Sequence, residues 1–331
     1  MRKVLILGGT GWLGGAIARA ALERGDAVTC LARGRSGAMP PGVTAIVADR
    51  AETDAYARVA DSAWHEVIEL SSDPVLVRGA LVALAARAVH WTFISTVSVY
   101  ASDAEPDATE AAATTEPGDE QDYAAAKVAC ERATTAALGD RALIVRPGLI
   151  VGAGDPSDRF GYWVARFALA GAAPVVTPDS ADRFAQVIDL RDLAAFVVDA
   201  GARGVTGVIN AVGHPQALGE LLDTAAEVSG FRGQQVPLAD AVMLDKGVAY
   251  WAGPRSLPLW LPVEASGFAR RSNAAYLAAG GRIRPLRETL TATLDDERSR
   301  GLERERRAGL TRHEELELLD ILTENGVSAV R

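Results

Sequence analysis

Near its start the chain reads Lys3-Val-Leu-Ile-Leu-Gly-Gly-Thr-Gly-Trp-Leu-Gly14, an apolar run of strand length that leads into three regularly spaced glycines. A helical pattern, Trp12–Arg24, follows at once. Gly8 permits a tight turn out of the strand, Gly11 lets the backbone approach a pyrophosphate, and Gly14 lets the helix pack closely on the sheet. The helix N-terminus adds unsatisfied N–H groups and the positive end of a dipole. The pattern predicts the phosphate-binding turn of a dinucleotide-binding fold.

The composition narrows the class of protein. The chain has 331 residues, of which 49% are hydrophobic and 23% charged, with a formal net charge of −9. These values are typical of a globular protein with one large core or two unequal domains. The acidic balance argues against a nucleic acid as partner, because such proteins present a basic face. The chain contains no run of about 18 apolar residues, the length that could span a membrane. We therefore expect a cytoplasmic protein that acts on a small molecule.

The two cysteines, Cys30 and Cys130, lie in an apolar run and in a helical pattern. Two cysteines cannot build a disulfide framework or a metal cluster, and both are expected to be small core residues. We therefore expect no metal in the site.

Strand-like runs alternate with amphipathic helical patterns through the first half of the chain. Strands are expected at Lys3–Leu7, Ala27–Leu31, Val43–Val47, Val67–Leu70, Trp91–Ser95 and Ala142–Val145. Helices are expected between them, at Trp12–Arg24, Thr53–Ala60, Val75–Ala88 and Tyr123–Leu138. This order predicts an α/β fold with a doubly wound parallel sheet of the Rossmann type, whose ligand lies at the carboxyl ends of the strands.

The second half is less regular and predicts a smaller C-terminal subdomain. Residues 187–211 look like elements that return to the sheet, so the dinucleotide-binding core is expected to comprise residues 1–150 and this segment. Residues 151–186 and 212–331 then form the substrate-side subdomain and the C-terminal helices.

Three segments outside the core motifs bear on this organisation. Ala101–Asp122 holds eight acidic residues and no basic one, which is typical of an active-site flap or of a solvated insertion. Pro285–Arg307 is expected to be a helix that ends in a solvated charged face. The last helix, His313–Glu324, would pack on the body of the protein or on a second subunit, which leaves a homodimer open.

The segment Tyr123-Ala-Ala-Ala-Lys127 places a phenol and an amine one helical turn apart, so both project to the same side. An ammonium beside a phenol favours the phenolate and lowers its pKa from about 10. Such a tyrosine can exchange a proton with a substrate hydroxyl or carbonyl while a hydride moves to or from a nicotinamide. The alternative is an ordinary tyrosine and lysine on a helix. The upstream glycine turn favours catalysis, as does the rarity of lysine, which supplies three of 34 basic residues.

Four motifs occur in order along the chain: the glycine turn, Ser95-Thr96-x-x-Val99-Tyr100, Tyr123-x-x-x-Lys127 and Arg146-Pro147-Gly148. Together they resemble the extended or atypical short-chain dehydrogenase/reductase superfamily, which includes NAD-dependent epimerase/dehydratases and isoflavone-reductase-like proteins. The resemblance covers at least residues 1–200. It implies that Thr96 holds the substrate oxygen beside Tyr123, while Lys127 depresses the pKa of the tyrosine and orients the ribose.

The resemblance also implies a set of cofactor contacts. Asp49 would contact the adenine, and Ser71 and Ser72 would run beside the ribose and phosphates. The residues of the glycine turn would bind the pyrophosphate and those after the sixth strand would lie along the nicotinamide; they are Gly8, Thr10, Gly11, Trp12, Leu13 and Gly14, and Pro147, Gly148 and Leu149.

The end of the second strand departs from the NAD-specific pattern. NAD-specific members carry an acid there that binds the ribose hydroxyls. This chain has Ala32 instead, followed by Arg33-Gly-Arg35. Guanidinium groups suit a 2′-phosphate, which they grip in a bidentate manner, so NADP is the expected cofactor and NAD the alternative.

The substrate side departs from the family pattern as well. UDP-sugar epimerases carry a phosphate-binding arginine just before the strand that matches Gln186–Leu190. Here Ala185 occupies that position and Arg183 lies two residues earlier, which weakens the expectation of a diphosphate sugar. Arg159, Arg183 and Ser98 remain candidate substrate contacts.

We therefore expect an NADP(H)-dependent oxidoreductase that moves a hydride between nicotinamide and a carbonyl or alcohol of a small molecule. A nucleotide-sugar epimerase or dehydratase with tightly bound NAD is the first alternative, because it uses the same residues. A dinucleotide-binding module without catalysis is the second.

Overall fold

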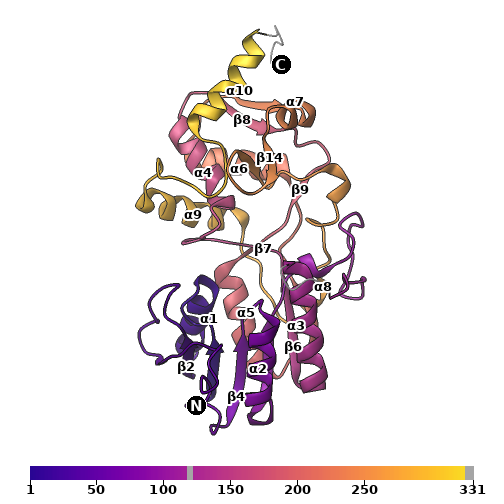
Figure 1. Ribbon diagram of the computed structural model, residues 1–331. Helices are drawn as coiled ribbons and strands as arrows, with labels where there is room; N and C mark the ends of the chain where they lie inside the picture. The colour runs from indigo at the N-terminus through magenta and orange to yellow at the C-terminus, as the bar shows by residue number, and fades with distance from the viewer. Residues whose placement is uncertain (118–121, 325–331) are drawn as a thin grey trace. The chain divides into compact units, whose positions relative to one another are not determined.

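The computed structural model describes residues 1–117 and 122–324 and divides the chain into two compact units (Figure 1). Unit 1 comprises residues 1–150, 187–214 and 271–283; unit 2 comprises residues 151–186, 215–270 and those from 284 onward. Residues 212–214 and 271–283, which the sequence analysis assigned to the second region, thus belong to unit 1.

Unit 1 is built on a seven-stranded sheet with the order β11-β6-β5-β4-β1-β2-β3. Every neighbouring pair in it is parallel. The order reverses between β1 and β4, as in a doubly wound sheet, so the predicted fold class is confirmed. The strands are β1 (Lys3–Leu7), β2 (Ala27–Ala32), β3 (Thr44–Val47), β4 (Trp64–Glu69), β5 (Ala88–Ile94), β6 (Ala142–Pro147) and β11 (Gly207–Ala211).

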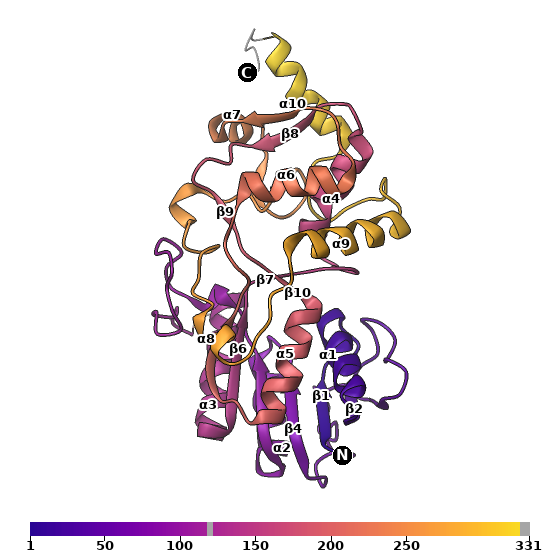
Figure 2. The ribbon, with the colours of Figure 1, turned by 180° about the vertical axis from the view of Figure 1, so that it is seen from behind.

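Helices cover both faces of this sheet because its strands are apolar on both sides. One face packs against α1 (Trp12–Glu23) and α5 (Leu190–Arg203), which lie in front of the sheet in Figure 2. The other face packs against α2 (Pro74–Leu84) and α3 (Tyr123–Leu138). The smaller elements of this unit are η1 (Ala85–Arg87), η2 (Val97–Val99), η3 (Gly139–Arg141), α8 (Ala274–Ala278) and the paired strands β7 (Leu149–Val151) and β10 (Val187–Asp189).

The helix expected at Thr53–Ala60 is absent, and consecutive turns occupy the segment instead. Ala55, Tyr56 and Val59 still pack into the core beside α2. The Tyr56 hydroxyl donates to the Leu76 carbonyl at 3.3 Å. Tertiary anchoring of three apolar side chains therefore replaces the helical periodicity that the sequence suggested.

Among the described residues, unit 2 contains the remaining helices and three short strand pairs. Its central helices are α4 (Arg159–Ala170), α6 (Leu218–Ser229) and α9 (Leu286–Arg300). The other elements are β8 (Val175–Pro178), β9 (Phe184–Ala185), β12 (Gln216–Ala217), β13 (Gln235–Leu238), α7 (Asp240–Asp245), β14 (Ala249–Trp251), β15 (Ser256–Pro258), η4 (Val263–Ala265) and α10 (Arg312–Glu324).

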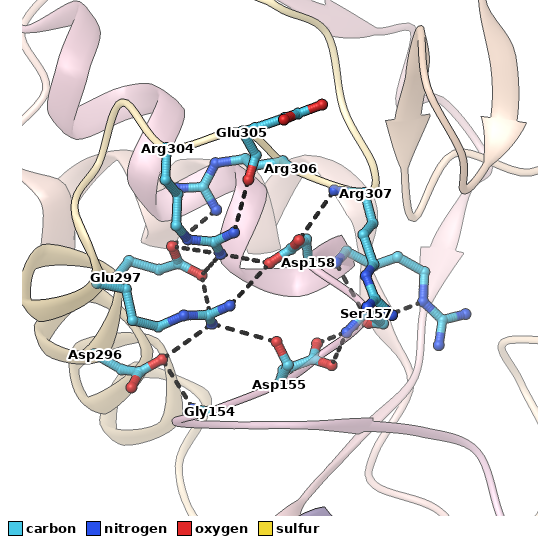
Figure 3. Close-up of polar contacts among 12 residues, drawn as sticks. Gly154, Asp155, Ser157, Asp158, Asp296, Glu297, Arg304, Glu305, Arg306 and Arg307 are labelled. Atoms are coloured by element: carbon cyan, nitrogen blue, oxygen red, sulfur yellow. Dashed lines mark hydrogen bonds and ion pairs between the residues drawn. The ribbon is translucent and has the colours of Figure 1, made fainter. Parts of the chain in front are cut away.

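The charged run after α9 is not the solvated helical face that we expected. The helix ends at Arg300, and the residues that follow form a loop. Glu297, 2% exposed, forms ion pairs with Arg304 at 3.1 Å and Arg306 at 2.8 Å. Asp158, 4% exposed, pairs with Arg304 and accepts the backbone N–H of Arg307 at 3.0 Å (Figure 3).

The physical reason is the cost of a buried carboxylate without a partner. Two such groups lie inside unit 2, and arginines from the loop turn inward to neutralise them. Glu315 of α10 is likewise fully buried, pairs with Arg166 at 2.8 Å and accepts the Val176 N–H at 3.1 Å. The last helix therefore packs on unit 2.

None of the helices in the described part of the chain combines the length and apolar character that crossing a membrane requires.

A cluster of buried charged groups surrounds Glu66 in the first half of β4, away from the carboxyl ends of the strands. Glu66 of β4 accepts hydrogen bonds from Thr92 at 2.6 Å and from Arg2 at 3.0 Å, and faces Nδ1 of His90 at 3.1 Å. Nε2 of His90 lies 2.7 Å from the Val205 carbonyl, which can only accept. Both ring nitrogens therefore donate when the imidazole is protonated.

We expect this cluster to make the stability of the fold depend on pH. Burial lowers the pKa of His90, but the hydrogen bond and charge of Glu66 outweigh it and raise the pKa above 6.5. A histidine whose pKa is raised by folding stabilises the protein fully at a pH below its pKa in the unfolded state. This stabilisation is lost as the pH rises through its pKa in the folded state. The melting temperature should therefore fall as pH rises above about 6.5, and His90→Gln should remove this dependence. Thermal denaturation across that range measures it.

His313→Gln is the matched control, because the His313 side chain is 85% exposed. It should keep the wild-type pH profile. A His90→Gln variant with the same slope as the wild type would contradict the assignment.

Candidate cofactor and catalytic site

The glycine turn is held by close backbone contacts. Gly8 has φ +112°, which favours glycine, and its N–H donates to the Leu31 carbonyl at 2.9 Å. A Cβ atom on Gly14 would lie 2.3 Å from the Gly8 carbonyl oxygen. No side chain fits there without a backbone shift, so Gly14 lets α1 begin directly against the turn.

Gly11 has a different environment. A Cβ atom there would meet only the Gly8 oxygen, at an ordinary 3.6 Å. Gly11 is the N-cap of α1, with φ −72° and no side-chain cap hydrogen bond. Open space beside a helix N-terminus without a side-chain cap fits the pyrophosphate of a dinucleotide. Of the neighbouring predicted contacts, Thr10 is buried and Trp12 and Leu13 are half-buried.

The sequence analysis missed Gly9. A Cβ atom at this position would lie 2.5 Å from Sγ of Cys30 on the adjacent strand. Burial raises the pKa of the Cys30 thiol to about 12, so it packs as a neutral group. The sequence signal for the close approach at Gly9 was the second glycine of the pair Gly8-Gly9, directly after the strand.

The ends of β2 and β3 bring two predicted contacts together. Arg33 and Arg35 follow Ala32 and are exposed. Nη1 of Arg33 lies 3.9 Å from Oδ2 of Asp49, while Oδ1 of Asp49 accepts the Ala51 N–H at 3.2 Å. Two exposed arginines therefore follow Ala32, the residue at the position where an NAD-specific chain carries an acid.

The end of β5 carries the hydroxyl groups. Thr96 caps η2 and accepts the Ser98 N–H at 3.1 Å, and its own hydroxyl donates to the Ser98 hydroxyl at 3.2 Å. Ser95 is 2% exposed, and its hydroxyl has no hydrogen-bond partner among the described residues.

Tyr123 and Lys127 occupy the first two turns of α3, whose N-cap Asp122 accepts the Ala125 N–H at 2.9 Å. Tyr123 is 53% exposed and Lys127 only 3%. The Lys127 ammonium donates to the carbonyls of Ser71 at 3.0 Å and Ile94 at 2.6 Å. Burial lowers the pKa of Lys127 to about 8, so the group is still mostly charged at neutral pH.

The remaining predicted contacts lie at the same edge of the sheet. Ser71 is half-buried and Ser72 exposed, directly after β4. Pro147 ends β6, the Gly148 N–H donates to the Ala211 carbonyl at 3.4 Å, and Leu149 is buried. The structure thus gathers the predicted cofactor and catalytic residues at the carboxyl ends of the strands, where doubly wound sheets bind ligands.

The two predicted arginines of unit 2 are both engaged. Arg183 is 7% exposed and donates to the carbonyls of Leu261 at 3.0 Å and Asp179, and to the Asp240 carboxylate. Arg159 is half-buried, with its guanidinium 5.0 Å from the centre of the Trp251 ring.

The described part of the acidic loop is anchored in unit 1. Its Glu110 carboxylate accepts the Asn210 N–H at 2.8 Å, and Asp103 pairs with the buried Arg271 at 2.9 Å. Residues 118–121, within the segment considered as a flap, lie outside the described residues.

A buried ion pair near the site also escaped the sequence analysis. Glu69, at the end of β4, is 0% exposed and pairs with Arg50. The available signal was a carboxylate inside the otherwise apolar run Val67–Leu70, because a buried carboxylate requires a partner.

The sheet order, the glycine turn and the lysine-bearing helix define an NAD(P)-dependent enzyme of the short-chain dehydrogenase/reductase type. Residues 4–213 match the model of the NAD dependent epimerase/dehydratase family. The chain belongs to this family, and the resemblance drawn from the four motifs is confirmed.

The chain is similar to 2′-dehydrokanamycin reductase of Streptomyces kanamyceticus, with 31% identity over 241 residues that cover 69% of this chain and 67% of that protein. It also resembles the Bordetella bronchiseptica enzyme WbmH in complex with NAD+ (TM-score 0.64, 20% identity, 90% and 99% of the two chains). A third relative is UDP-glucuronic acid 4-epimerase from Bacillus cereus in complex with NAD (TM-score 0.66, 15% identity, 90% and 99%). At these identities the two structures support the fold.

The two glycines should respond differently to the same substitution. Gly11→Ala meets no close contact and should leave the free energy of unfolding within about 1 kcal/mol of the wild type. Its methyl group would occupy the space beside the helix N-terminus, so dinucleotide affinity should fall at least about tenfold. Gly14→Ala should destabilise the fold by about 1–3 kcal/mol, because its Cβ meets backbone. Urea denaturation and cofactor titration separate the two effects.

A Gly11→Ala variant that binds the dinucleotide as well as the wild type would contradict the placement of the pyrophosphate.

Proposed function

We propose that the protein is an NADPH-dependent reductase that converts a carbonyl group of a small molecule to an alcohol. One observation carries the proposal. In the first two turns of α3, an exposed Tyr123 lies one helical turn before the buried ammonium of Lys127. Bound NADPH supplies the hydride for the carbonyl carbon. The chain supplies the proton and the groups that hold the substrate oxygen.

Tyr123 donates its phenolic proton to the oxygen of the carbonyl as that oxygen gains negative charge. Lys127 stabilises the resulting phenolate through its positive charge. Its two backbone carbonyl acceptors, Ser71 and Ile94, fix the ammonium in place. A fixed charge needs little reorganisation when the phenolate forms.

The hydroxyls of Thr96 and Ser98 position the reacting oxygen. They are hydrogen-bonded to one another at 3.2 Å, and each hydroxyl can both donate and accept. A substrate oxygen can therefore replace one partner of this pair. Thr96 holds the substrate oxygen and Ser98 supports it.

The choice of NADPH rests on the end of β2. Ala32 cannot accept hydrogen bonds from ribose hydroxyls, while Arg33 and Arg35 are exposed beside it. Guanidinium groups bind phosphate through charge-assisted hydrogen bonds. Asp49, 3.9 Å from Arg33, then orients this arginine as well as contacting the adenine.

Two observations favour net reduction over a nucleotide-sugar reaction. The similar Streptomyces kanamyceticus protein is a reductase by name. Arg183, the nearest candidate for a diphosphate, has guanidinium nitrogens engaged by Leu261, Asp179 and Asp240. Binding a diphosphate there would require breaking buried contacts.

Cofactor preference can be measured directly. The wild type should bind NADPH more tightly than NADH, and Arg33→Ala should weaken NADPH binding about 10- to 100-fold through the loss of a charge-assisted contact. NADH affinity should change little. Arg87→Ala, at an exposed site on η1, controls for the loss of one positive charge. Titration by fluorescence decides the question, and tighter NADH binding by the wild type would overturn the NADPH assignment.

Catalysis can be tested with Tyr123→Phe, which keeps the ring and removes the proton. NADPH oxidation with a panel of aldehydes, ketones and dehydrogenated aminosugars should fall by about 10²–10⁴, with folding intact. Tyr276→Phe also removes a hydroxyl, one that donates to the Arg282 carbonyl at 2.9 Å, and should retain turnover.

The same assay distinguishes the epimerase alternative. Products and NADPH absorbance are followed together. Isomerisation of a nucleotide sugar without net NADPH consumption would replace the reductase proposal with the epimerase.

A further inference from the structure

Glu69 has an unusual position for a carboxylate. It ends β4, is fully buried, and both of its oxygens are used. Oε1 accepts Nη1 of Arg50 at 2.8 Å and the backbone N–H of Ser71 at 2.8 Å, and Oε2 accepts Nη2 of Arg50. The carboxylate thus fixes the first turn after the strand.

Arg50 is held from other directions as well. Its Nη2 donates to the Leu76 carbonyl in α2 and its Nε to the Tyr56 hydroxyl, both at 2.8 Å. Burial alone would lower the pKa of Arg50, but the charge and hydrogen bonds of Glu69 raise it. Arg50 is thus anchored on α2 and on the segment that follows β3, and it is a rigid support for Glu69 at the end of β4.

Ser71 links this pair to Lys127. The N–H of Ser71 binds Glu69, and its carbonyl accepts the Lys127 ammonium at 3.0 Å. One residue therefore connects the carboxylate to the ammonium. Asp49, the predicted adenine contact, is the chain neighbour of Arg50, so the same pair also borders the far end of the predicted cofactor contacts.

We propose that Glu69, supported by Arg50, is a positioning residue that holds the Ser71 turn where its carbonyl receives the Lys127 ammonium. Glu69 acts through the Ser71 N–H, which it accepts at 2.8 Å, and through its charge. The proposal rests on the role of Lys127 in the proposed reductase. Nothing in the four family motifs includes Glu69 or Arg50.

The charges around Lys127 agree with this arrangement. Burial lowers the pKa of Lys127, and Cys130, Glu69 and Glu131 act in the opposite direction. Burial raises the pKa of the Cys130 thiol to about 12, so this group is neutral near pH 8. Glu131 is neutralised by Arg146 through two hydrogen bonds of 2.9 and 2.6 Å. From β5, the Phe93 ring lies 4.8 Å from the ammonium and carries no charge.

A matched pair of double variants separates the two effects of Glu69, which are to hold the Ser71 turn in position and to place a negative charge near Lys127. Arg50→Met with Glu69→Gln removes both charges but keeps an oxygen that can accept the Ser71 N–H. Arg50→Met with Glu69→Leu removes the acceptor as well. Neutralising both partners avoids leaving a buried arginine unpaired, which would threaten folding.

Lys127 can be observed directly because Lys3 and Lys246 are the only other lysines in the chain. Carbon-13 labelling of lysine gives three side-chain signals, which Lys3→Arg and Lys246→Arg assign. Both double variants should lower the titration midpoint of Lys127 by at least about half a pH unit, because Glu69, rather than Arg50, is the member of the pair whose charge opposes the effect of burial on Lys127. Glu66→Gln, also buried on β4, should leave the midpoint unchanged.

Cofactor titration supplies the second measurement. The Leu double variant should bind NADPH about tenfold more weakly than the Gln double variant, because the Ser71 turn loses its acceptor. An unchanged Lys127 midpoint in both double variants, an equal shift in Glu66→Gln, or equal NADPH affinity of the two double variants would overturn the proposal.

The failure of the proposed reductase would be distinguishable. If Tyr123→Phe and Lys127→Met retain turnover, the catalytic assignment is wrong, while the titration of Lys127 in the resting protein still decides whether Glu69 positions it.

Discussion

The burial of a single ammonium group constrains the edge of the unit 1 sheet at which the strands have their carboxyl ends. Lys127 is almost inaccessible to water and reaches two backbone carbonyls, one after β4 and one at the end of β5. A buried ammonium without partners would lose its proton or destabilise the fold. Its contacts therefore fix α3 against both strands. Tyr123, one turn earlier, is left at the exposed rim. One helix thus carries a fixed charge and an accessible phenol, which is the separation that the proposed proton transfer to a substrate requires.

The glycine turn follows the same logic by different means. Here the constraint is close approach of backbone, because the Gly14 position lies within 2.3 Å of the Gly8 oxygen once a Cβ is added. The contact brings the N-terminus of α1 to the end of β1. Parallel strands place all their carboxyl ends at one edge, so a helix dipole, hydroxyl groups and an ammonium from distant parts of the sequence share that edge. The order and direction of the strands therefore matter as much for the candidate site as the identity of any one residue.

The sequence predicted what is local and left out what depends on distant pairing. The sheet strands of unit 1 were found within a few residues, since the apolar runs of the central strands are buried on both faces, and Tyr123–Leu138 was predicted with the bounds that the structure shows. The segment at Thr53–Ala60 misled because its apolar residues follow tertiary anchors rather than a helical period. The run after Glu303 misled because its partners, Asp158 and Glu297, lie elsewhere in the chain. Glu69 and Arg50 are separated by 19 residues, and nothing in their spacing announces a contact. The roles of Thr96, Tyr123 and Lys127 stay predictions, supported by their placement.

The partners of each arginine decide whether it is available to bind an external anion. Arginine supplies most of its basic residues, but many of them neutralise internal carboxylates, as Arg50, Arg146 and Arg304 do. Arg183 is used in the same way, so its place in the sequence near a phosphate-binding position of relatives does not make it available for a phosphate. An arginine is a candidate for binding an external anion only where its guanidinium remains accessible. Arg33, whose side chain is 54% exposed after β2, meets that condition, and a phosphate could replace its ion pair with Asp49, which spans 3.9 Å.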